Sequence, residues 1–438
     1  MARIVGRRQL VATGVVLVGA FVAAGARAAS PDPPGDREVW ITMPARELAE
    51  VREDLRATAG DRLPNVLATE GDRALAATRE SLLADIAGAI HERYHRCAGF
   101  RTHWTRESAE RALRAPAEPA GPLVQYTIDN PATVNAILGQ VTQANLTPVI
   151  SQLASYWTRY YTTQTGLDAA VWLKARWEQI AGGRPDVSVS FFDHPGWLQH
   201  SVIVRIGGTQ LPQEVVVLGA HLDSIRSGQP SNCNVTPPPS SCRAPGADDD
   251  ASGVASLTEM FRAAMAAGYR PARTVYIMAY AGEEAGLLGS QEIATHMSVN
   301  YPYRSRQVVV GALQLDMTNY LSPAANAVDV GIIADPEYTN ASQNAFIRDL
   351  MTAYLPALTK DTVSACGYGC SDHASWAMEG ATAASFPFEA RFGEHNPLIH
   401  QLGDTLANSD PTGAHATKFA RLAAAYMAEL AKGSVSAP

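Results

Sequence analysis

One stretch of the sequence, residues 214–224, reads EVVVLGAHLDS. Its first half is an apolar run rich in valine, which is typical of a strand buried on both faces of a parallel sheet. His221 and Asp223 follow that run directly. Because functional side chains gather at the carboxyl ends of strands in such sheets, this stretch predicts both an α/β fold and the place of a site.

Strands and helices alternate along the chain after about residue 130. The apolar spacing predicts strands at residues 187–192, 201–206, 214–219, 274–279, 308–316 and 328–333. It predicts helices at residues 134–161, 167–180, 252–267, 287–297, 343–355 and 414–430. This alternation is typical of a mostly parallel central sheet with helices on both faces.

Acidic residues and a second histidine accompany the other predicted strand ends. Glu283 and Glu284 follow one strand, and Asp316 ends the next. The loop 246–253, GADDDASG, opens a helix, and His400 lies far downstream. Carboxylates brought together at low dielectric repel one another, and divalent cations remove that repulsion. Imidazole and carboxylate ligands without thiolates suit catalytic zinc. Each motif alone is equally typical of a structural polar residue, so the hypothesis of a metal centre depends on their conjunction.

Six motifs carry a resemblance to a known family. They read GAHLDS, GADDDASG, AYAGEE, QLDMTNY, CGYGCSDHASW and NPLIHQLGDTLANSDPTG. In this order they closely resemble the secreted bacterial leucyl aminopeptidases, which are co-catalytic two-zinc exopeptidases, from about residue 130 to the C-terminal region. The resemblance implies a zinc aminopeptidase fold and two Zn²⁺ per chain. It also implies peptide substrates with a free and preferably hydrophobic, Leu-type N-terminal residue.

The same resemblance implies roles for individual residues. Its five zinc ligands would be His221, Asp249, Glu284, Asp316 and His400. Asp249 would bridge the two ions, with His221 and Asp316 on one ion and Glu284 and His400 on the other. Glu283 would be the general base, and Asp223 would orient the imidazole of His221 from behind.

Apolar residues near the motifs would form the substrate pocket. By the resemblance these are Met317, Cys366, Tyr368, Cys370, Phe386, Phe388, Phe392 and Ile399, although plain core packing would suit each of them. Such a pocket discriminates only modestly among hydrophobic side chains. Tyr368 could also hydrogen-bond the tetrahedral intermediate. His395 stands where an aromatic wall residue would be expected, which makes the pocket slightly more polar.

The N-terminus and the net charge indicate an exported, acidic protein. Basic residues precede an apolar run at 10–24, and Ala26-Arg27-Ala28 offers a cleavage site, so residues 1–28 are predicted to be a signal peptide. Arg7 and Arg8 suggest twin-arginine export, and a membrane anchor is the alternative. The formal net charge of −8 disfavours nucleic acid or anionic lipid as partners. We expect a secreted or periplasmic monomer that does not associate with membranes after signal removal.

Five cysteines are consistent with an oxidising compartment. Their spacing predicts disulfides between Cys233 and Cys242 and between Cys366 and Cys370, which leaves Cys97 single. A four-thiolate zinc site is the alternative.

The chain divides into three parts. After the signal peptide, residues 29–122 are predicted to form a small helical or mixed unit, either a propeptide or an accessory segment, with a proline-rich boundary at 115–122. Residues 123–438 are the predicted catalytic domain. Compared with the family pattern, the loop 226–245 of this domain is elaborated, and it should lie at the rim of the active-site cleft.

Three other functions share features with this reading. Glutaminyl cyclases have this fold but use a single zinc, and the complete set of five ligands argues against them. A carboxypeptidase or amino-acid deacylase would need an arginine for the substrate carboxylate. A receptor-like module on an inactive peptidase fold would have lost ligands, and none is missing.

Overall fold

The computed structural model describes residues 37–97, 99–114, 124–230, 232–300, 307–379 and 383–436. The predicted signal peptide and the proline-rich boundary at 115–122 lie outside these residues. Within the described ranges, no helix combines the length and apolar character that a bilayer span requires.

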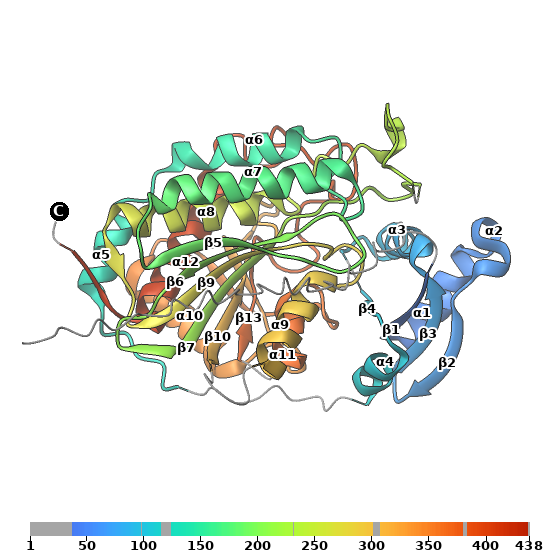
Figure 1. Ribbon diagram of the computed structural model, residues 1–438, viewed down its shortest axis with the longest axis horizontal. Helices are drawn as coiled ribbons and strands as arrows, with labels where there is room; N and C mark the ends of the chain where they lie inside the picture. Colours follow the sequence, from blue (N-terminus) through green and yellow to red (C-terminus); the bar gives the residue numbers. More distant parts are fainter. Residues whose placement is uncertain are drawn as a thin grey trace, which may run out of the picture.

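A six-stranded sheet forms the centre of the main domain, by which we mean the described residues from 124 onward (Figure 1). The strands lie in the order β13-β10-β7-β9-β6-β5. Their bounds are β5 Val187–Phe192, β6 Ser201–Ile206, β7 Leu211–His221, β9 Arg273–Tyr280, β10 Val308–Gln314 and β13 Ala384–Ser385. Neighbours from β13 to β9 pair in parallel, whereas β6 and β5 are antiparallel additions at one edge. The predicted mostly parallel α/β sheet is confirmed.

Both faces of β7 are buried, as its unbroken apolar run predicts. Val216 and Leu218 join the core on one face, whereas Val215 and Val217 join the core on the other. The first face is covered by α5 Pro131–Leu138, α6 Leu146–Ser155, α7 Gln164–Ala181, α8 Ala251–Ala266, α10 Ala341–Tyr354 and α12 Ala414–Ala431. The second is covered by α9 Leu288–Asn300 and α11 His373–Met378, on the opposite side of the sheet in Figure 1.

The single helix predicted at 134–161 is wrong. The structure has two helices there, α5 and α6, joined through the short 3-10 helix η3, Gln143–Asn145. Pro148 lies in the first turn of α6. Proline lacks the N–H that a helix interior requires and is tolerated in a first turn, so the helix must restart just before it.

Smaller sheets flank the main domain. Strands β11 Val330–Ile333, β12 Lys360–Ser364 and β14 Pro387–Phe388 form one, and β8 Tyr269–Arg270 pairs with β15 Ser434–Val435. The strand predicted at 328–333 corresponds to β11 and therefore lies outside the central sheet. A 3-10 turn, η4 Ser240–Cys242, lies in the elaborated loop.

The N-terminal unit, residues 37–114, is a mixed α/β structure. An antiparallel sheet of β2 Asn65–Glu70, β3 Arg73–Arg79, β1 Glu38–Pro44 and β4 Arg101–His103 packs with α1 Ala45–Asp54, α2 Arg56–Ala59, α3 Leu83–Tyr94 and α4 Arg106–Leu113. Short 3-10 turns, η1 Gly60–Arg62 and η2 Glu80–Leu82, connect them. The prediction of a small helical or mixed unit is confirmed, and Leu83, Ile86 and Ile90 form the buried face of α3. Alanine-rich strands such as β3 carry little β-propensity and were not predicted.

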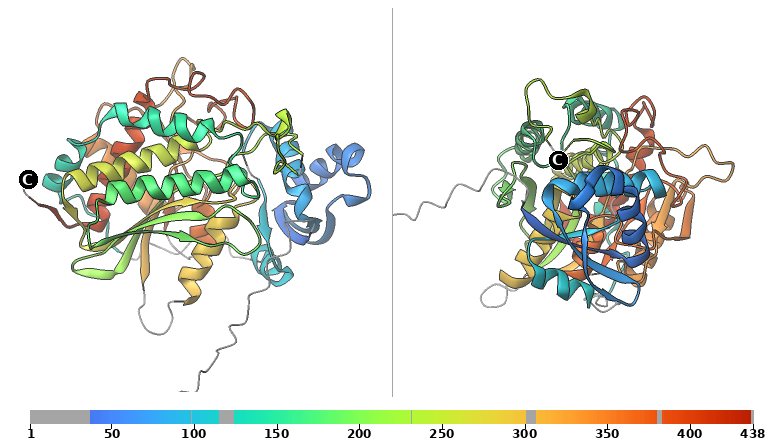
Figure 2. Two further views of the ribbon diagram at one scale, coloured as in Figure 1. Left: turned by 45° about the horizontal axis from the view of Figure 1, so that its top comes forward. Right: turned by 90° about the vertical axis from the view of Figure 1, so that its right-hand side faces the viewer.

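The N-terminal unit packs against one end of the main domain, where α3 and β4 lie nearest to it (Figures 1 and 2). The hydrophobic core of the unit includes Tyr160, Tyr161 and Trp197 of the main domain. The two parts therefore share apolar packing.

Candidate active site and metal centre

Five ligand-type residues converge where the strands end. His221 ends β7, Asp249 precedes α8, Glu284 follows β9, Asp316 follows β10, and His400 comes from a downstream loop. Each is at most 3% exposed. His221 Nε2 lies 2.9 Å from Asp249 Oδ1 and 3.4 Å from Asp316 Oδ1. His400 Nε2 lies 3.2 Å from Asp249 Oδ2 and 2.8 Å from Glu284 Oε2. Asp249 thus offers one oxygen to each imidazole.

Several polar atoms in this cluster have no hydrogen-bond partner in the described part of the chain. They are both carboxylate oxygens of Glu283 and of Glu284, Asp316 Oδ1, and both ring nitrogens of His400. His400 Nε2 and Glu284 Oε2 are close but lack hydrogen-bond geometry. Buried polar atoms are normally hydrogen-bonded. Buried donor and acceptor atoms that lie close together without hydrogen bonds are typical of metal ligands in the absence of the metal.

The electrostatics of the cluster favour positive charge. Burial raises the pKa of Glu284 to about 7 and raises the pKa of Glu283 well above its usual value. Burial lowers the pKa of His400, but the nearby carboxylates of Glu284 and Asp249 outweigh it and raise that pKa to about 10. Divalent cations would supply the missing positive charge, so the residues fit a metal centre.

Comparison with known proteins shows the family of the chain. Residues 201–426 match peptidase family M28. The chain belongs to this family. A protein of Saccharomyces cerevisiae described as a probable aminopeptidase is 33% identical over 323 residues, covering 72% of this chain and 78% of its own. Leucine aminopeptidase 1 of Trichophyton rubrum is 34% identical over 329 residues, covering 72% and 82%. The crystal structure of the Legionella pneumophila LapA aminopeptidase superposes with a TM-score of 0.74 at 28% identity, covering 91% of this chain and all of that one.

The M28 membership settles the class of enzyme. Enzymes of the family depend on zinc, and the relatives and the structural neighbour are aminopeptidases. The chain is therefore a metallo-aminopeptidase, as the sequence motifs predict.

Three consecutive aspartates in this M28 chain have different partners. Asp250 accepts hydrogen bonds from the backbone N–H groups of His221 (2.9 Å), Gly253 (2.8 Å) and Met317 (3.1 Å). It thereby joins the end of β7, the start of α8 and the segment after β10. Asp249 alone of the three contacts the imidazoles.

Asp404 positions the aspartate triplet and was not predicted as a site residue. Its carboxylate accepts from the backbone N–H of Asp248 (2.8 Å) and of Asp249 (3.2 Å). Asp248 in turn accepts from Asn319 N (2.9 Å) and Asn396 Nδ2 (2.9 Å). The one signal in the sequence is that Asp404 follows His400 within the motif NPLIHQLGDTL.

Asp223 and Ser371 hold other members of the cluster. Asp223 accepts from the backbone N–H of Glu283 (2.9 Å) and Glu284 (3.2 Å), and its Oδ1 lies 3.5 Å from His221 Nδ1. Asp223 therefore lies behind the His221 ring, the position from which it was predicted to orient the imidazole. The hydroxyl of Ser371 donates to Asp316 Oδ2 at 2.7 Å, a contact that was not predicted.

The predicted pocket residues form one apolar cluster beside the metal centre. It contains Met317, Cys366, Tyr368, Cys370, Phe386, Phe388, Phe392 and Ile399, together with Ile333 and Cys97, which were not predicted to be there. His395 lies at its edge, with its ring centroid 5.5 Å from that of Phe388. A small cavity within this cluster is also lined by Asp316, so it reaches one of the candidate ligands.

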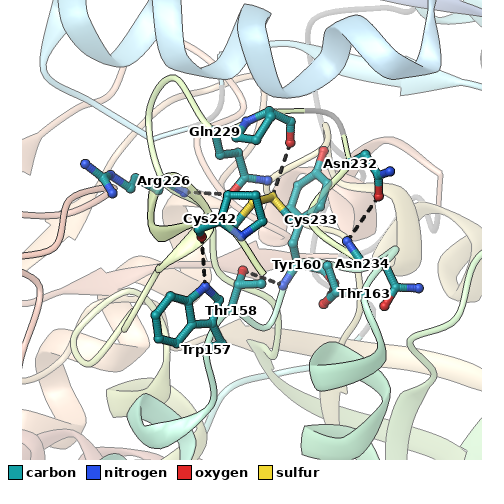
Figure 3. Close-up of a disulfide and its surroundings, with 12 residues drawn as sticks. Trp157, Thr158, Tyr160, Thr163, Arg226, Gln229, Asn232, Cys233, Asn234 and Cys242 are labelled. Atoms are coloured by element: carbon teal, nitrogen blue, oxygen red, sulfur yellow. Dashed lines mark hydrogen bonds between the residues drawn. A yellow bond between two sulfur atoms is a disulfide. The ribbon is translucent and has the colours of Figure 1, made fainter. Parts of the chain in front are cut away.

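Both predicted disulfides are present, and Cys97 is a free, buried thiol. The four-thiolate zinc site is therefore wrong. Figure 3 shows the Cys233–Cys242 bridge in the elaborated loop, where Trp157 Nε1 donates to Pro239 O at 3.1 Å. The same loop reaches the site, because the N–H of Ser227 donates to the backbone carbonyl of His400 at 2.9 Å.

Arg159 is a further residue that only the structure places at this M28 site. It is completely buried. Its guanidinium donates to the backbone carbonyls of Leu222 (2.8 Å), Pro245 (2.6 Å) and Gly246 (2.9 Å). It thereby joins the loop after β7 to the loop that leads into the aspartate triplet.

Arg159→Leu is expected to lower the free energy of unfolding by about 3 kcal/mol or more, since each buried acceptor left unpaired costs about 1–3 kcal/mol. Urea unfolding measures this. Arg243→Leu is the matched control, because Arg243 also donates to backbone carbonyls, including Ala154 O at 2.8 Å, but is only half-buried. Equal losses in the two variants would show that Arg159 has no special structural role.

Proposed function

We propose that this M28 enzyme is a two-zinc aminopeptidase that removes Leu-type hydrophobic residues from the free N-terminus of peptides. One observation carries the proposal. A single carboxylate, Asp249, faces a separate imidazole with each of its oxygens, at 2.9 Å and 3.2 Å. This is the arrangement that a carboxylate bridging two ions requires.

The ligands divide into two sets around Asp249. His221 and Asp316 would hold one ion, and Glu284 and His400 the other, in agreement with their mutual distances of 3.4 Å and 2.8 Å. When bound, zinc would supply Lewis-acid activation of a water molecule and of the scissile carbonyl.

Glu283 is the proposed general base. Its carboxylate is buried and without a hydrogen-bond partner among the described residues, and its backbone N–H is held by Asp223. A carboxylate so placed is free to take a proton from the attacking water and return it to the leaving amine. Burial raises the pKa of Glu283, which makes it a better proton acceptor than an exposed carboxylate.

The substrate would place its N-terminal side chain among the pocket residues. The free α-amine would then lie against the acidic residues Glu284 and Asp249, where an N-acetyl group would lack charge complementarity. Tyr368 is proposed to hydrogen-bond the oxyanion that develops on the scissile carbonyl. In this structure its hydroxyl donates to the backbone carbonyl of Cys97 at 2.7 Å, so the proposed role requires that contact to be released.

We further propose export through a signal peptide at residues 1–28, a catalytic domain at 123–438, and a monomer in a secreted or periplasmic setting. The two disulfides support an oxidising compartment. The intervening residues 29–122 are proposed to be a propeptide.

The test is hydrolysis of leucine p-nitroanilide and of its N-acetyl derivative by the purified protein, before and after limited proteolysis. We expect turnover of the free substrate to be at least about 100-fold faster, since a site that pairs with an amine rejects analogues lacking it. A chelator should abolish the activity, and added zinc should restore it. Equal turnover of the two substrates would overturn the proposed requirement for a free N-terminus and direct attention to deacylase substrates. Inactivity of a zinc-loaded protein would overturn the proposed N-terminal specificity and favour cyclase substrates.

A further inference from the structure

The N-terminal unit touches the turn that carries the proposed base. In β4, the backbone N–H of Thr102 donates to Gly286 O at 3.0 Å, and the hydroxyl of Thr102 donates to Ala285 O at 2.7 Å. Arg101 forms an ion pair with Glu379 at 2.7 Å. The unit is therefore fastened to the main domain immediately beside Glu283 and Glu284, in keeping with the position of β4 in Figure 1.

The segment from His91 to Cys97, which ends α3 and continues just beyond it, reaches the candidate metal ligands and the pocket. The ring of His91 lies 4.8 Å from that of His400, centroid to centroid. The guanidinium of Arg96 lies 3.8 Å above the ring of Tyr368, whose hydroxyl donates to Cys97 O. Groups that the substrate would need are thus already engaged.

Cys97 brings its sulfur to the ligands. Its Sγ lies 3.1 Å from Asp249 Oδ2, the oxygen that faces His400 Nε2 at 3.2 Å. One ligand atom from each of Cys97, Asp249 and His400 lies within 4.8 Å of the others. Zinc bonds of about 2.3 Å to sulfur and 2.0 Å to oxygen or nitrogen place tetrahedral ligand atoms about 3.3–3.5 Å apart. The separations of Cys97 Sγ and of His400 Nε2 from Asp249 Oδ2, 3.1 Å and 3.2 Å, are close to that spacing.

A second observation points to a ligand at the same place. Glu284 and His400 are at most 3% exposed, and Glu284 Oε1, Glu284 Oε2 and His400 Nε2 have no hydrogen-bond partner among the described residues. Cys97 also packs in the apolar cluster, with Met317 Sδ 3.9 Å from its sulfur, but its thiol donates to Asp249 Oδ2 and so lies beside this set of unpaired ligand atoms.

We propose that Cys97 is a ligand of the ion held by Glu284 and His400, and that this bond keeps the full-length enzyme latent. The inference rests on the proposed two-zinc function. On coordination the thiol gives up its proton to solvent, and the sulfur takes the position that water or the substrate amine would use. When the segment withdraws or is cut away, the sulfur–metal bond breaks, the thiolate regains a proton, and water enters.

The experiment uses the full-length chain loaded with Co²⁺ in place of zinc. A thiolate bound to Co²⁺ gives a near-ultraviolet charge-transfer band. We expect this band in the wild type and its loss in Cys97→Ser, with equal metal content in both. Arg96→Ala is the matched control, because it loosens the same segment against Tyr368 but keeps the thiol, and it should retain the band.

A second measurement compares activity towards leucine p-nitroanilide. Full-length Cys97→Ser should be at least about tenfold more active than the full-length wild type, because the closed state loses its strongest bond. Cobalt-loaded wild type without the band would overturn the Cys97 proposal and leave the proposed function standing. A chain that binds no metal would overturn both.

Discussion

Glu283→Gln is expected to lower kcat by about 10²- to 10⁴-fold, the usual contribution of general acid–base catalysis. Glutamine keeps the shape of the side chain but cannot accept a proton from water. The N–H of residue 283 would still donate to Asp223, so the local backbone should be unchanged. Steady-state kinetics on the proteolytically trimmed protein, together with its zinc content, measure the effect.

The matched control is another buried glutamate, Glu259→Gln. Glu259 is 2% exposed and bonds the N–H of Thr142 (2.6 Å), Asn145 Nδ2 (2.9 Å) and Arg262 Nε (2.7 Å), away from the ligand cluster. Its loss should reduce stability and leave kcat close to wild type. If Glu283→Gln kept kcat within about tenfold of wild type, a level below the range for a general base, the assignment of Glu283 would be wrong.

Asp249→Asn is expected to weaken metal binding by more than about 100-fold, beyond the loss seen when residues behind the ligands are changed. The substitution removes a negative charge that faces both imidazoles, at 2.9 Å and 3.2 Å. Both ions should be affected together because the carboxylate is shared. Metal content after dialysis against a weak chelator measures this, and activity should fall in parallel.

The adjacent substitution, Asp250→Asn, is the control that distinguishes loss of a metal ligand from loss of local structure. Asp250 bonds three backbone N–H groups and no imidazole side chain, and asparagine can still accept some of those bonds. We expect a loss of stability of about 1–3 kcal/mol with both metals retained. Loss of only one metal in Asp249→Asn would argue that Asp249 does not bridge.

The sequence predicted those parts of the fold in which one local pattern has one structural solution. The run at 214–219 could be satisfied only by a strand covered on both faces, and Val215 to Leu218 do alternate between two cores. The helix at 134–161 failed because apolar spacing continued across a point where Pro148 forbids an uninterrupted helix. In β3 the sequence RALAATR gave no strand signal, because alanine favours helices and has little β-propensity.

The candidate site divides in a similar way. His221, Glu284 and Asp316 could be named as candidates because each stands at or just after a strand end, and the topology of parallel strands brings such ends together. Arg159 and Asp404 were not found. Arg159 lies 63 residues before Leu222 in the chain, and Asp404 lies 156 residues after Asp248, so their contacts leave no local pattern.

By itself, then, the sequence determined the α/β sheet, the order of the candidate ligands along it and the class of hydrolase, because these depend on periodicity and on motifs within single segments. Only the tertiary structure decided which aspartate of the triplet faces both imidazoles, and that the N-terminal unit brings Cys97 within 3.1 Å of Asp249. The physical reason is that hydrogen-bond satisfaction and packing across distant segments select one arrangement among many that the same local patterns allow.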